Sequence, residues 1–394
     1  MRILITTEDY VGSQFGGIPR VLTETCRRLV AHGDEVVVLT PRLPADLPAR
    51  EVVEGVQVAR YDCDNSSNMR RLVSSFRASK ALVVQLADEG RFDVVNPHFY
   101  LSALGVVHSD ACRATRIVST FHGPAGPELL AENSGQNRIT ALVQARLVDS
   151  MQRHILKRSH AVVAYSKYSR GLIRNMVPAR QHGSISVIAG AVDTDHFAPR
   201  HSTAEARSRT DLPQDASVLL TVRRLIRRNG LDRLVAAMPE IVRQIPEALL
   251  VIVGKGEIRA ELEAQAASLG MEEHIRFAGF VPDDDLPTYY CAADLSIMPT
   301  RALEGFGLPI LESMACGTPV LGSAVGAIPE IVGGFEPGLL IADIEPSTIA
   351  DGVIRTIEAH RGDQDFRRKC REHVLQNYSW DTHVDRLREL YQSG

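Results

Sequence analysis

Two glutamates flank a glycine-containing stretch, Glu304-Gly-Phe-Gly-Leu-Pro-Ile-Leu-Glu312, and their types and spacing could do chemistry. Pro309 suits the first position of a helix, since its missing N–H would have no partner there, and Gly317 followed by Pro319 is typical of a helix end. The N–H groups at the helix start and the helix dipole favour an anion such as phosphate. The flanking carboxylates are better placed to accept hydrogen bonds from hydroxyl groups. The stretch therefore predicts a ligand with hydroxyls at both ends and a phosphate between them, as in a sugar nucleotide.

A run of arginines follows a predicted strand in Thr221-Val-Arg-Arg-Leu-Ile-Arg-Arg-Asn-Gly230. Guanidinium groups match phosphate oxygens in pairs, and fixed cations can stabilise the charge that develops on a leaving nucleoside diphosphate. This stretch therefore predicts phosphate contacts. A solvated basic loop is the alternative, above all for Arg227 and Arg228.

Two further loops follow predicted strands in the N-terminal half. Phe15-Gly16-Gly17 precedes a predicted helix, and adjacent glycines allow backbone amides to approach a ligand closely. Thr120-Phe-His122-Gly123 places a histidine directly after an apolar run. Taken alone, the first pattern is also that of an ordinary turn, and the second also that of a core histidine.

Bulk composition limits the class of protein. The 394 residues are 44% hydrophobic and 23% charged with a net charge of −4, which indicates a globular protein without a nucleic-acid footprint. No apolar run reaches the roughly 20 residues needed to span a bilayer, the N-terminus does not resemble a signal peptide, and the six cysteines form no C-x-x-C pair. We therefore expect a soluble cytoplasmic protein. Of the three Asp-x-Asp pairs, Asp62–Asp64 and Asp193–Asp195 lie in loops in poor context for a metal, and Asp283–Asp285 is typical of a helix start. We therefore expect no metal site.

Short apolar runs alternate with amphipathic segments along most of the chain, which predicts parallel sheets covered by helices on both faces. A polar stretch near residue 200 interrupts the alternation, and the pattern then restarts at Ser217–Val222. We therefore predict an α/β protein of two doubly wound domains, with ligands outside the carboxyl ends of the strands. The expected strands, in chain order, are Ile3–Thr6, Glu35–Thr40, Val56–Ala59, Val94–Asn96, Arg116–Thr120, Ala161–Ala164, Ile185–Ile188, Ser217–Val222, Ala248–Val253, Ile275–Phe277, Leu295–Met298 and Val320–Gly322.

The central motif resembles the donor motif of the family 4 retaining glycosyltransferases, which have the two-domain GT-B fold. The resemblance lies in the Glu-x7-Glu spacing, the Gly-Phe-Gly-Leu-Pro core and the following Ala315-Cys-Gly-Thr-Pro-Val320. Weaker similarities cover Val187–Asp193, Val253–Glu257 and Ala278–Val281. The resemblance implies two facing Rossmann-like domains with a cleft between them. It places an acceptor-binding domain at residues 1–198, a nucleotide-sugar-binding domain at 199–377, and a final helix at 378–394 that crosses back to the first domain.

The resemblance also implies roles for individual residues. It implies that Glu304 binds hydroxyl groups of the donor sugar, that Glu312 binds the ribose, and that Arg224 binds the diphosphate. The sequence departs from the family where Arg223 replaces a glycine and Asn229 replaces a lysine, so the second phosphate cation is either Arg228 or a group at Asn229. His122 is implied to reach the donor sugar near the reacting carbon. The remaining implied donor-binding residues are Gly16, Gly17, Phe280, Val281, Phe306, Gly307 and Leu308.

These observations predict a retaining, metal-independent glycosyltransferase without a cofactor. It would move a hexose-type sugar from a nucleoside diphosphate sugar to the hydroxyl of a small molecule, a lipid-linked molecule or a saccharide. A phosphorylase or nucleotide-sugar epimerase of the same fold, and a non-catalytic nucleotide-sugar or glycan-binding protein, are the alternatives. Acceptor choice is expected to lie in residues 41–68 and 124–138, and the basic region 146–180 could contact an anionic membrane surface. The donor sugar, the base, the acceptor and the oligomeric state are left open.

Overall fold

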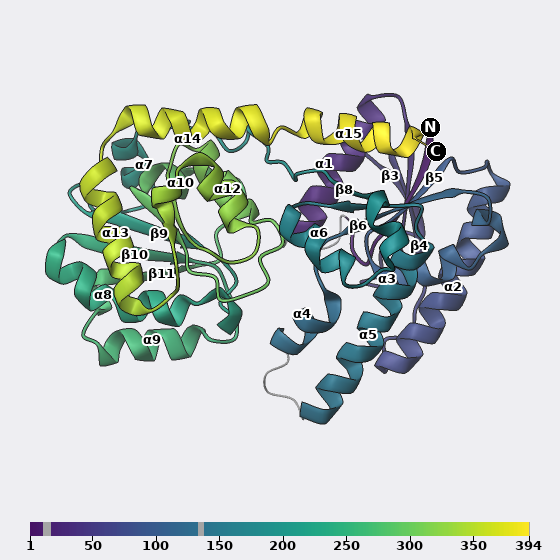
Figure 1. The fold of residues 1–394 in the computed structure, drawn as a ribbon, viewed down its shortest axis with the longest axis horizontal. Helices are drawn as coiled ribbons and strands as arrows, with labels where there is room; N and C mark the ends of the chain where they lie inside the picture. Colours follow the sequence, from purple (N-terminus) through teal and green to yellow (C-terminus); the bar gives the residue numbers. More distant parts are fainter. Residues whose placement is uncertain (11–16, 133–137, 394) are drawn as a thin grey trace. The chain divides into compact units, whose positions relative to one another are not determined.

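The computed structural model describes residues 1–10, 17–132 and 138–393, and the chain divides into two units (Figure 1). The N-terminal unit contains Met1–Gly190 together with Trp380–Gly394, and the C-terminal unit contains Ala191–Ser379. Each unit has its own sheet with helices on both faces. Among the described residues, no helix is long and apolar enough to cross a membrane.

The N-terminal sheet has eight strands in the order β3-β4-β2-β1-β5-β6-β7-β8, and all pairs are parallel except β3–β4. The strands are β1 (Arg2–Thr6), β2 (Glu35–Pro41), β3 (Arg50–Val53), β4 (Val56–Tyr61), β5 (Val94–Pro97), β6 (Arg116–Phe121), β7 (Ala161–Ala164) and β8 (Ile185–Val187). The helices are α1 (Gly17–Ala31), α2 (Asn68–Asp88), α3 (Tyr100–Val107), α4 (Ala125–Glu132), α5 (Arg138–Arg158), α6 (Lys167–Arg174) and α15 (Trp380–Gln392).

Strand β1 is buried on both faces, which explains its continuous apolar sequence. Ile3 and Ile5 pack in one core with residues of α1 and α15, whereas Leu4 packs in the opposite core with residues of α2 and α3. Alternate residues of one strand therefore join two different helix layers.

The C-terminal sheet has six strands in the order β11-β10-β9-β12-β13-β14, and every pair is parallel. The strands are β9 (Ser217–Val222), β10 (Ala248–Val253), β11 (Ile275–Gly279), β12 (Leu295–Met298), β13 (Val320–Ser323) and β14 (Leu340–Ile341). The helices are α7 (Thr203–Arg209), α8 (Leu231–Gln244), α9 (Arg259–Ser268), α10 (Leu286–Ala292), α11 (Leu308–Ala315), α12 (Ile328–Phe335), α13 (Pro346–His360) and α14 (Gln364–Asn377).

All twelve strands expected from the sequence are present, with ends that differ by at most two residues. The two units divide after Gly190, whereas the boundary expected from the sequence lies after residue 198. Phe197 is buried in the core of the C-terminal unit, and Arg371 of α14 donates hydrogen bonds to the carbonyl oxygens of Thr194 and Phe197. The short elements β3, α4 and α7 were not expected, since each lies in a stretch rich in proline, glycine or polar residues.

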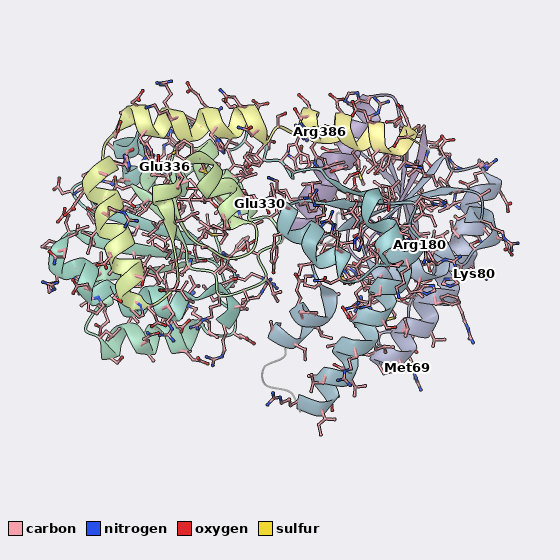
Figure 2. All side chains as sticks on the ribbon, viewed as in Figure 1. Met69, Lys80, Arg180, Glu330, Glu336 and Arg386 are labelled. Carbon is pink, nitrogen blue, oxygen red and sulfur yellow. The ribbon has the colours of Figure 1, made fainter. Side chains whose placement is uncertain are left out.

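Helix α15 belongs to the N-terminal unit, although the whole C-terminal unit precedes it in the chain. Val384, Leu387 and Tyr391 enter the core that contains β1 and α1. Arg388 donates to the carboxylate of Asp34 (2.7 Å), which also accepts from the N-terminal ammonium group (2.9 Å). Burial alone would raise the pKa of Asp34, but the hydrogen bonds from these two cations lower it. Arg386 lies on the exposed side of the same helix (Figure 2).

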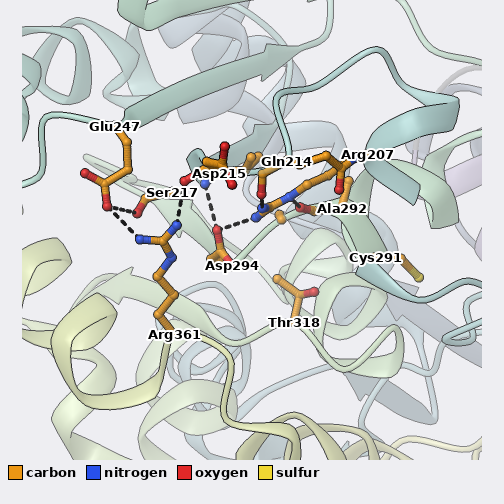
Figure 3. Close-up of polar contacts among 12 residues, drawn as sticks. Arg207, Gln214, Asp215, Ser217, Glu247, Cys291, Ala292, Asp294, Thr318 and Arg361 are labelled. Carbon is orange, nitrogen blue, oxygen red and sulfur yellow. Dashed lines mark hydrogen bonds and ion pairs between the residues drawn. The ribbon is translucent and has the colours of Figure 1, made fainter. Parts of the chain in front are cut away.

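A buried ion pair joins α7 to the C-terminal sheet (Figure 3). Asp294 accepts a hydrogen bond from Nη2 of Arg207 (2.7 Å) and another from the backbone N–H of Val218 at the start of β9 (2.8 Å). The guanidinium group of Arg207 also donates to the carbonyl oxygens of Gln214 (2.6 Å) and Ala292 (3.1 Å). Because both side chains are at most 8% exposed, removing one would leave the other charge buried and unpaired.

We predict that Arg207→Met lowers the free energy of unfolding by about 3–5 kcal/mol, because Asp294 loses its buried counter-charge. Arg209→Met is the matched control, since Arg209 lies on the same helix and pairs with Glu205 at the surface. Its effect should stay below about 1 kcal/mol. Urea denaturation of the full chain measures both values, and equal effects of the two substitutions would contradict the importance of the buried pair.

Candidate functional site

The loop from β12 into α11 has the backbone geometry that the sequence predicts. Gly307 has a positive φ of 93° and immediately precedes α11, Pro309 lies in the first turn, and Gly317 has a φ of 80° just after the helix end. Leu303 also has a positive φ (62°), which is uncommon for a residue with a side chain and marks local strain next to Glu304. A Cβ at Gly326 would lie 2.3 Å from the carbonyl oxygen of Glu304. Only glycine at position 326 allows this loop to take its observed path.

The carboxylate of Glu304 is paired with Arg223, a contact that the sequence analysis missed. Nη2 of Arg223 lies 2.6 Å from Oε2 of Glu304, and the two side chains are only 9% and 14% exposed. Arg223 also donates to Oγ1 of Thr300 (2.7 Å) and Oδ1 of Asn229 (3.0 Å). Oε1 of Glu304 makes no hydrogen bond to the residues that the structure describes. One carboxylate oxygen is therefore fixed by the ion pair, and the other can accept a hydrogen bond from a ligand.

The other residues of the arginine-rich stretch have different environments. Asn229 is buried, and its amide donates to the carbonyl oxygen of Arg224 (2.7 Å) while accepting from Arg223. Arg228 is partly buried and donates to the carbonyl oxygen of Leu303 (2.8 Å). Arg224 is exposed, and Arg227 is exposed and paired with Glu261 (2.8 Å). Asn229 thus orients Arg223, whereas Arg228 places a positive charge beside the Glu304 loop.

The glycine-containing turn after β10, within the stretch Val253–Glu257 noted above, packs against this arginine loop. Cβ atoms at Gly254 and Gly256 would lie 1.9 Å from the carbonyl oxygen of Arg223 and 2.2 Å from that of Leu225. The absence of side chains therefore permits close backbone contact between the two loops. Nζ of Lys255 lies 5.0 Å from the ring centre of Phe280, a cation–π contact. Phe280 is exposed, and the neighbouring Val281 is buried.

Glu312 lies in the second turn of α11 and is only 3% exposed. Its Oε2 accepts a hydrogen bond from the hydroxyl group of Tyr290 on α10 (2.9 Å). This buried hydrogen bond offsets part of the cost of burying the carboxylate. The carboxylate of Glu304 is thus paired with the Arg223 guanidinium group, and that of Glu312 accepts a hydrogen bond from the Tyr290 hydroxyl group.

In the N-terminal unit, His122 follows β6 and contacts His98, which follows the neighbouring strand β5. Nε2 of His122 lies 2.8 Å from Nδ1 of His98, and Nε2 of His98 lies 2.6 Å from Oδ1 of the buried Asn96. The sequence analysis identified His122 but missed His98 and Asn96. The available signal was the polar pair Asn96 and His98 at the carboxyl end of the otherwise apolar strand β5. Since β5 and β6 are adjacent in the sheet, these residues lie near His122.

These histidines are neutral at neutral pH. Burial lowers the pKa of His122 to about 4. Burial also lowers the pKa of His98 well below its ordinary value, with smaller effects from His122 and His383. His122 is therefore a hydrogen-bonding group rather than a cation. Of the predicted glycine loop in this unit, Gly17 begins α1, and Gly16 lies outside the described residues.

The fold and the sites at the strand ends define the class of protein: a two-domain α/β glycosyltransferase of the GT-B type. The family model described as "Glycosyltransferase Family 4" matches residues 15–196, and the model "Glycosyl transferases group 1" matches residues 202–374. The chain belongs to glycosyltransferase family 4.

Similar proteins of known name support the same family. A GDP-mannose-dependent alpha-(1-6)-phosphatidylinositol monomannoside mannosyltransferase of Mycobacterium tuberculosis is 31% identical over 70% of this chain and 75% of that protein. A D-inositol 3-phosphate glycosyltransferase of Thermomonospora curvata is 28% identical over 95% of this chain and 90% of that protein.

Solved structures share the fold. A sucrose-phosphate synthase from Thermosynechococcus elongatus has a TM-score of 0.80 at 24% identity, covering 99% of this chain and 98% of its own. Anabaena HepE, solved with UDP and glucose, has a TM-score of 0.77 at 20% identity over the whole of both chains. At these identities the likeness concerns the arrangement of the two sheets and their helices.

The lowered pKa of His122 predicts that stability falls as the pH falls. Between about pH 6.5 and pH 4 the unfolded chain takes up a proton on this imidazole that the folded chain does not bind, so acid favours unfolding. The drop in Tm between pH 7 and pH 5 should be smaller in His122→Gln by about 4–8 °C, which corresponds to roughly 2 kcal/mol. Thermal unfolding at both pH values measures the difference. Identical drops in the two proteins would contradict the pKa assignment.

Proposed function

We propose that this protein is a retaining, metal-independent glycosyltransferase that moves a hexose-type sugar from a nucleoside diphosphate sugar to an acceptor hydroxyl group. The observation that carries the proposal is the loop entering α11. Its carboxylates Glu304 and Glu312 flank a helix N-terminus, and Arg223 and Arg228 hold the same loop from β9. A ligand that combines hydroxyl groups with a diphosphate matches this mixture of carboxylates, cations and backbone N–H groups.

Each part of the donor has a proposed partner in the C-terminal unit. The amides of Phe306, Gly307 and Leu308 would bind phosphate and sugar oxygens at the start of α11. Glu304 would accept hydrogen bonds from sugar hydroxyls through Oε1, and Glu312 from the ribose. Arg224 and Arg228 would neutralise the diphosphate. Phe280 and Val281 would contact the base.

The proposed reaction is a displacement in which acceptor and leaving group share one face of the sugar. The bond between the anomeric carbon and the diphosphate oxygen breaks as the bond to the acceptor oxygen forms, and the acceptor proton passes to the leaving diphosphate. The cations stabilise the charge that develops on that leaving group. Neutral His122 would contact the donor sugar and orient it. The N-terminal unit would bind the acceptor.

The names of the relatives suggest donors and acceptors to test. The mycobacterial relative is named for GDP-mannose and phosphatidylinositol monomannoside, and the Thermomonospora relative for D-inositol 3-phosphate. Both names contain an inositol unit carrying phosphate. We therefore include a phosphorylated inositol among the proposed acceptors of this chain.

The first experiment is a panel of GDP-mannose, UDP-glucose and ADP-glucose, with EDTA present, scored by the rise in Tm and by release of nucleoside diphosphate. One sugar nucleotide should raise Tm by several degrees, because a ligand at 100 times its Kd adds about 2.7 kcal/mol of stability. D-inositol 3-phosphate should then be tested for accelerating diphosphate release. Glu312→Gln should weaken the donor effect, and Glu358→Gln, at an exposed position of α13, serves as its control. Failure of every nucleotide to bind would refute the proposed function.

The arginines of the β9 loop provide a sharper test of the phosphate assignment. Arg224→Met and Arg228→Met should each lower kcat by roughly 10²-fold or more with a smaller change in KM, since charge on the leaving group develops mainly in the transition state. Arg227→Met is the matched control on the same loop, because this side chain is already paired with Glu261 at the surface. Its activity should stay within about threefold of the wild type. Full activity of Arg224→Met would show that this residue does not serve the diphosphate.

A further inference from the structure

A chain of hydrogen bonds links His122 to the C-terminal helix of the same unit, and it goes beyond the contacts that the proposed function requires. Its members are His122 after β6, His98 and Asn96 at the end of β5, and Tyr391 on α15. Asn96 is fully buried, and Tyr391 is 2% exposed. The order of donors and acceptors along this chain determines which nitrogen of His122 carries its proton.

The side-chain amide of Asn96 sets the direction of the chain. Its Nδ2 faces the carbonyl oxygen of Val118, which can only accept, and Oγ1 of Thr120 (3.0 Å). Oδ1 is therefore the atom that faces Nε2 of His98 (2.6 Å) and the hydroxyl group of Tyr391 (2.9 Å). Because this oxygen can only accept, His98 must carry a proton on Nε2, and the Tyr391 hydroxyl must donate.

The state of His98 then determines that of His122. Burial keeps the pKa of His98 well below its ordinary value, so the ring is neutral and carries only the Nε2 proton. Its Nδ1 is a lone-pair acceptor and faces Nε2 of His122 at 2.8 Å. His122 must therefore donate through Nε2–H, which leaves the lone pair on its own Nδ1. That nitrogen makes no hydrogen bond to residues within the described part of the chain.

We propose that Asn96 and His98 are positioning residues that hold His122 in its Nε2–H tautomer, so that Nδ1 accepts a hydrogen bond from a hydroxyl group of the donor sugar. Only the identity of the ligand rests on the proposed function, since the tautomer follows from the hydrogen bonds within this unit. A histidine held in this tautomer orients a sugar hydroxyl without adding charge beside the reacting carbon.

The rings that pack beside the two histidines are neutral as well, since burial raises the pKa of Tyr165 and lowers that of His383. The ring of Tyr165 lies 5.4 Å from that of His122 and 6.0 Å from that of His383 on α15. Nδ1 of His383 lies 2.7 Å from the carbonyl oxygen of Ala189. No hydrogen bond of His98 or His122 within the described residues reaches a carboxylate. An amide oxygen at the end of the chain selects a tautomer, whereas a carboxylate there would favour a protonated imidazole.

The test is the tautomeric state of His122 in the full chain, measured from ¹⁵N chemical shifts of labelled histidines at pH 7. Comparison with His122→Gln and His98→Leu identifies the two signals. We expect both rings to be neutral with the proton on Nε2, and we expect His122 to become a mixture of tautomers in His98→Leu. A protonated Nδ1 or an imidazolium at His122 in the wild type would overturn the proposal. An unchanged single tautomer in His98→Leu would overturn it equally.

In Asn96→Asp we expect the opposite tautomer of His122. A carboxylate at position 96 favours protonated His98, whose Nδ1–H would then donate to Nε2 of His122 and move the His122 proton to Nδ1. Tyr391→Phe removes a donor but leaves the amide in place, so the wild-type tautomer should persist. Loss of the Nε2–H signal in Tyr391→Phe, or its retention in a folded Asn96→Asp protein, would count against the proposed order of donors.

Measurements of transfer activity separate failure of this proposal from failure of the proposed function. His98→Leu should lower kcat about tenfold or more with little change in acceptor KM, as expected for the loss of one orienting hydrogen bond. His154→Leu is the matched control, because it removes a separate histidine–histidine contact of this unit, His108–His154 (3.1 Å), at an exposed position. If His98→Leu lost the single tautomer of His122 but kept full activity, the role of the tautomer in catalysis would be refuted. A wild-type tautomer as expected, with no transfer from any donor, would refute the proposed function and leave the hydrogen-bond chain intact.

Discussion

The buried ion pair between Arg223 and Glu304 is the constraint on which the geometry of the C-terminal site depends. Two charges that are almost inaccessible to water must stay paired, since either one alone would carry a desolvation cost of several kcal/mol. The pair joins the loop after β9 to the loop before α11, and Thr300 and Asn229 accept further hydrogen bonds from the guanidinium group. Glycines at 254 and 256 let the loop after β10 pack closely against the backbone of the β9 loop, and Gly326 allows the same close approach at Glu304. The ion pair thereby orients Glu304 and leaves Oε1 as its accepting atom.

The polar groups at the ends of β5 and β6 in the N-terminal unit are uncharged. Its polar groups also lie at the carboxyl ends of adjacent parallel strands, but burial keeps His98 and His122 neutral, and each hydrogen bond is completed by an amide, an imidazole or a hydroxyl group. The two units therefore offer different chemistry. The C-terminal loops supply cations beside backbone N–H groups, as a diphosphate requires, whereas the N-terminal strand ends supply neutral groups that can orient hydroxyls.

Local signals in the sequence predicted the features that depend on near neighbours. Glycine and proline at positions 307, 309 and 317 predicted the start and end of α11, and the apolar runs predicted the strands. Contacts between distant residues could not be predicted in this way. Arg223 and Glu304 are 81 residues apart, and Asn96 and Tyr391 are 295 apart, so no periodicity or spacing connects them. Arg223 was therefore expected within the phosphate-binding arginine stretch and as a replacement for glycine, not as the partner of Glu304, and His98 was not predicted. Strand β3 was missed for a different reason, because it is a short antiparallel edge strand after a proline-rich stretch.

Helix α15 completes polar contacts in the interior of the N-terminal unit. Asp34 pairs with both the N-terminal ammonium group and Arg388, so the two ends of the chain share one buried carboxylate. Oδ1 of Asn96 receives its second hydrogen bond from Tyr391, and leaving such buried groups unsatisfied costs about 1–3 kcal/mol each. The unit therefore completes its polar interior only after the C-terminal unit has been synthesised. The same helix that stabilises the first sheet also donates, through Tyr391, to the amide at the end of the hydrogen-bond chain that reaches His122.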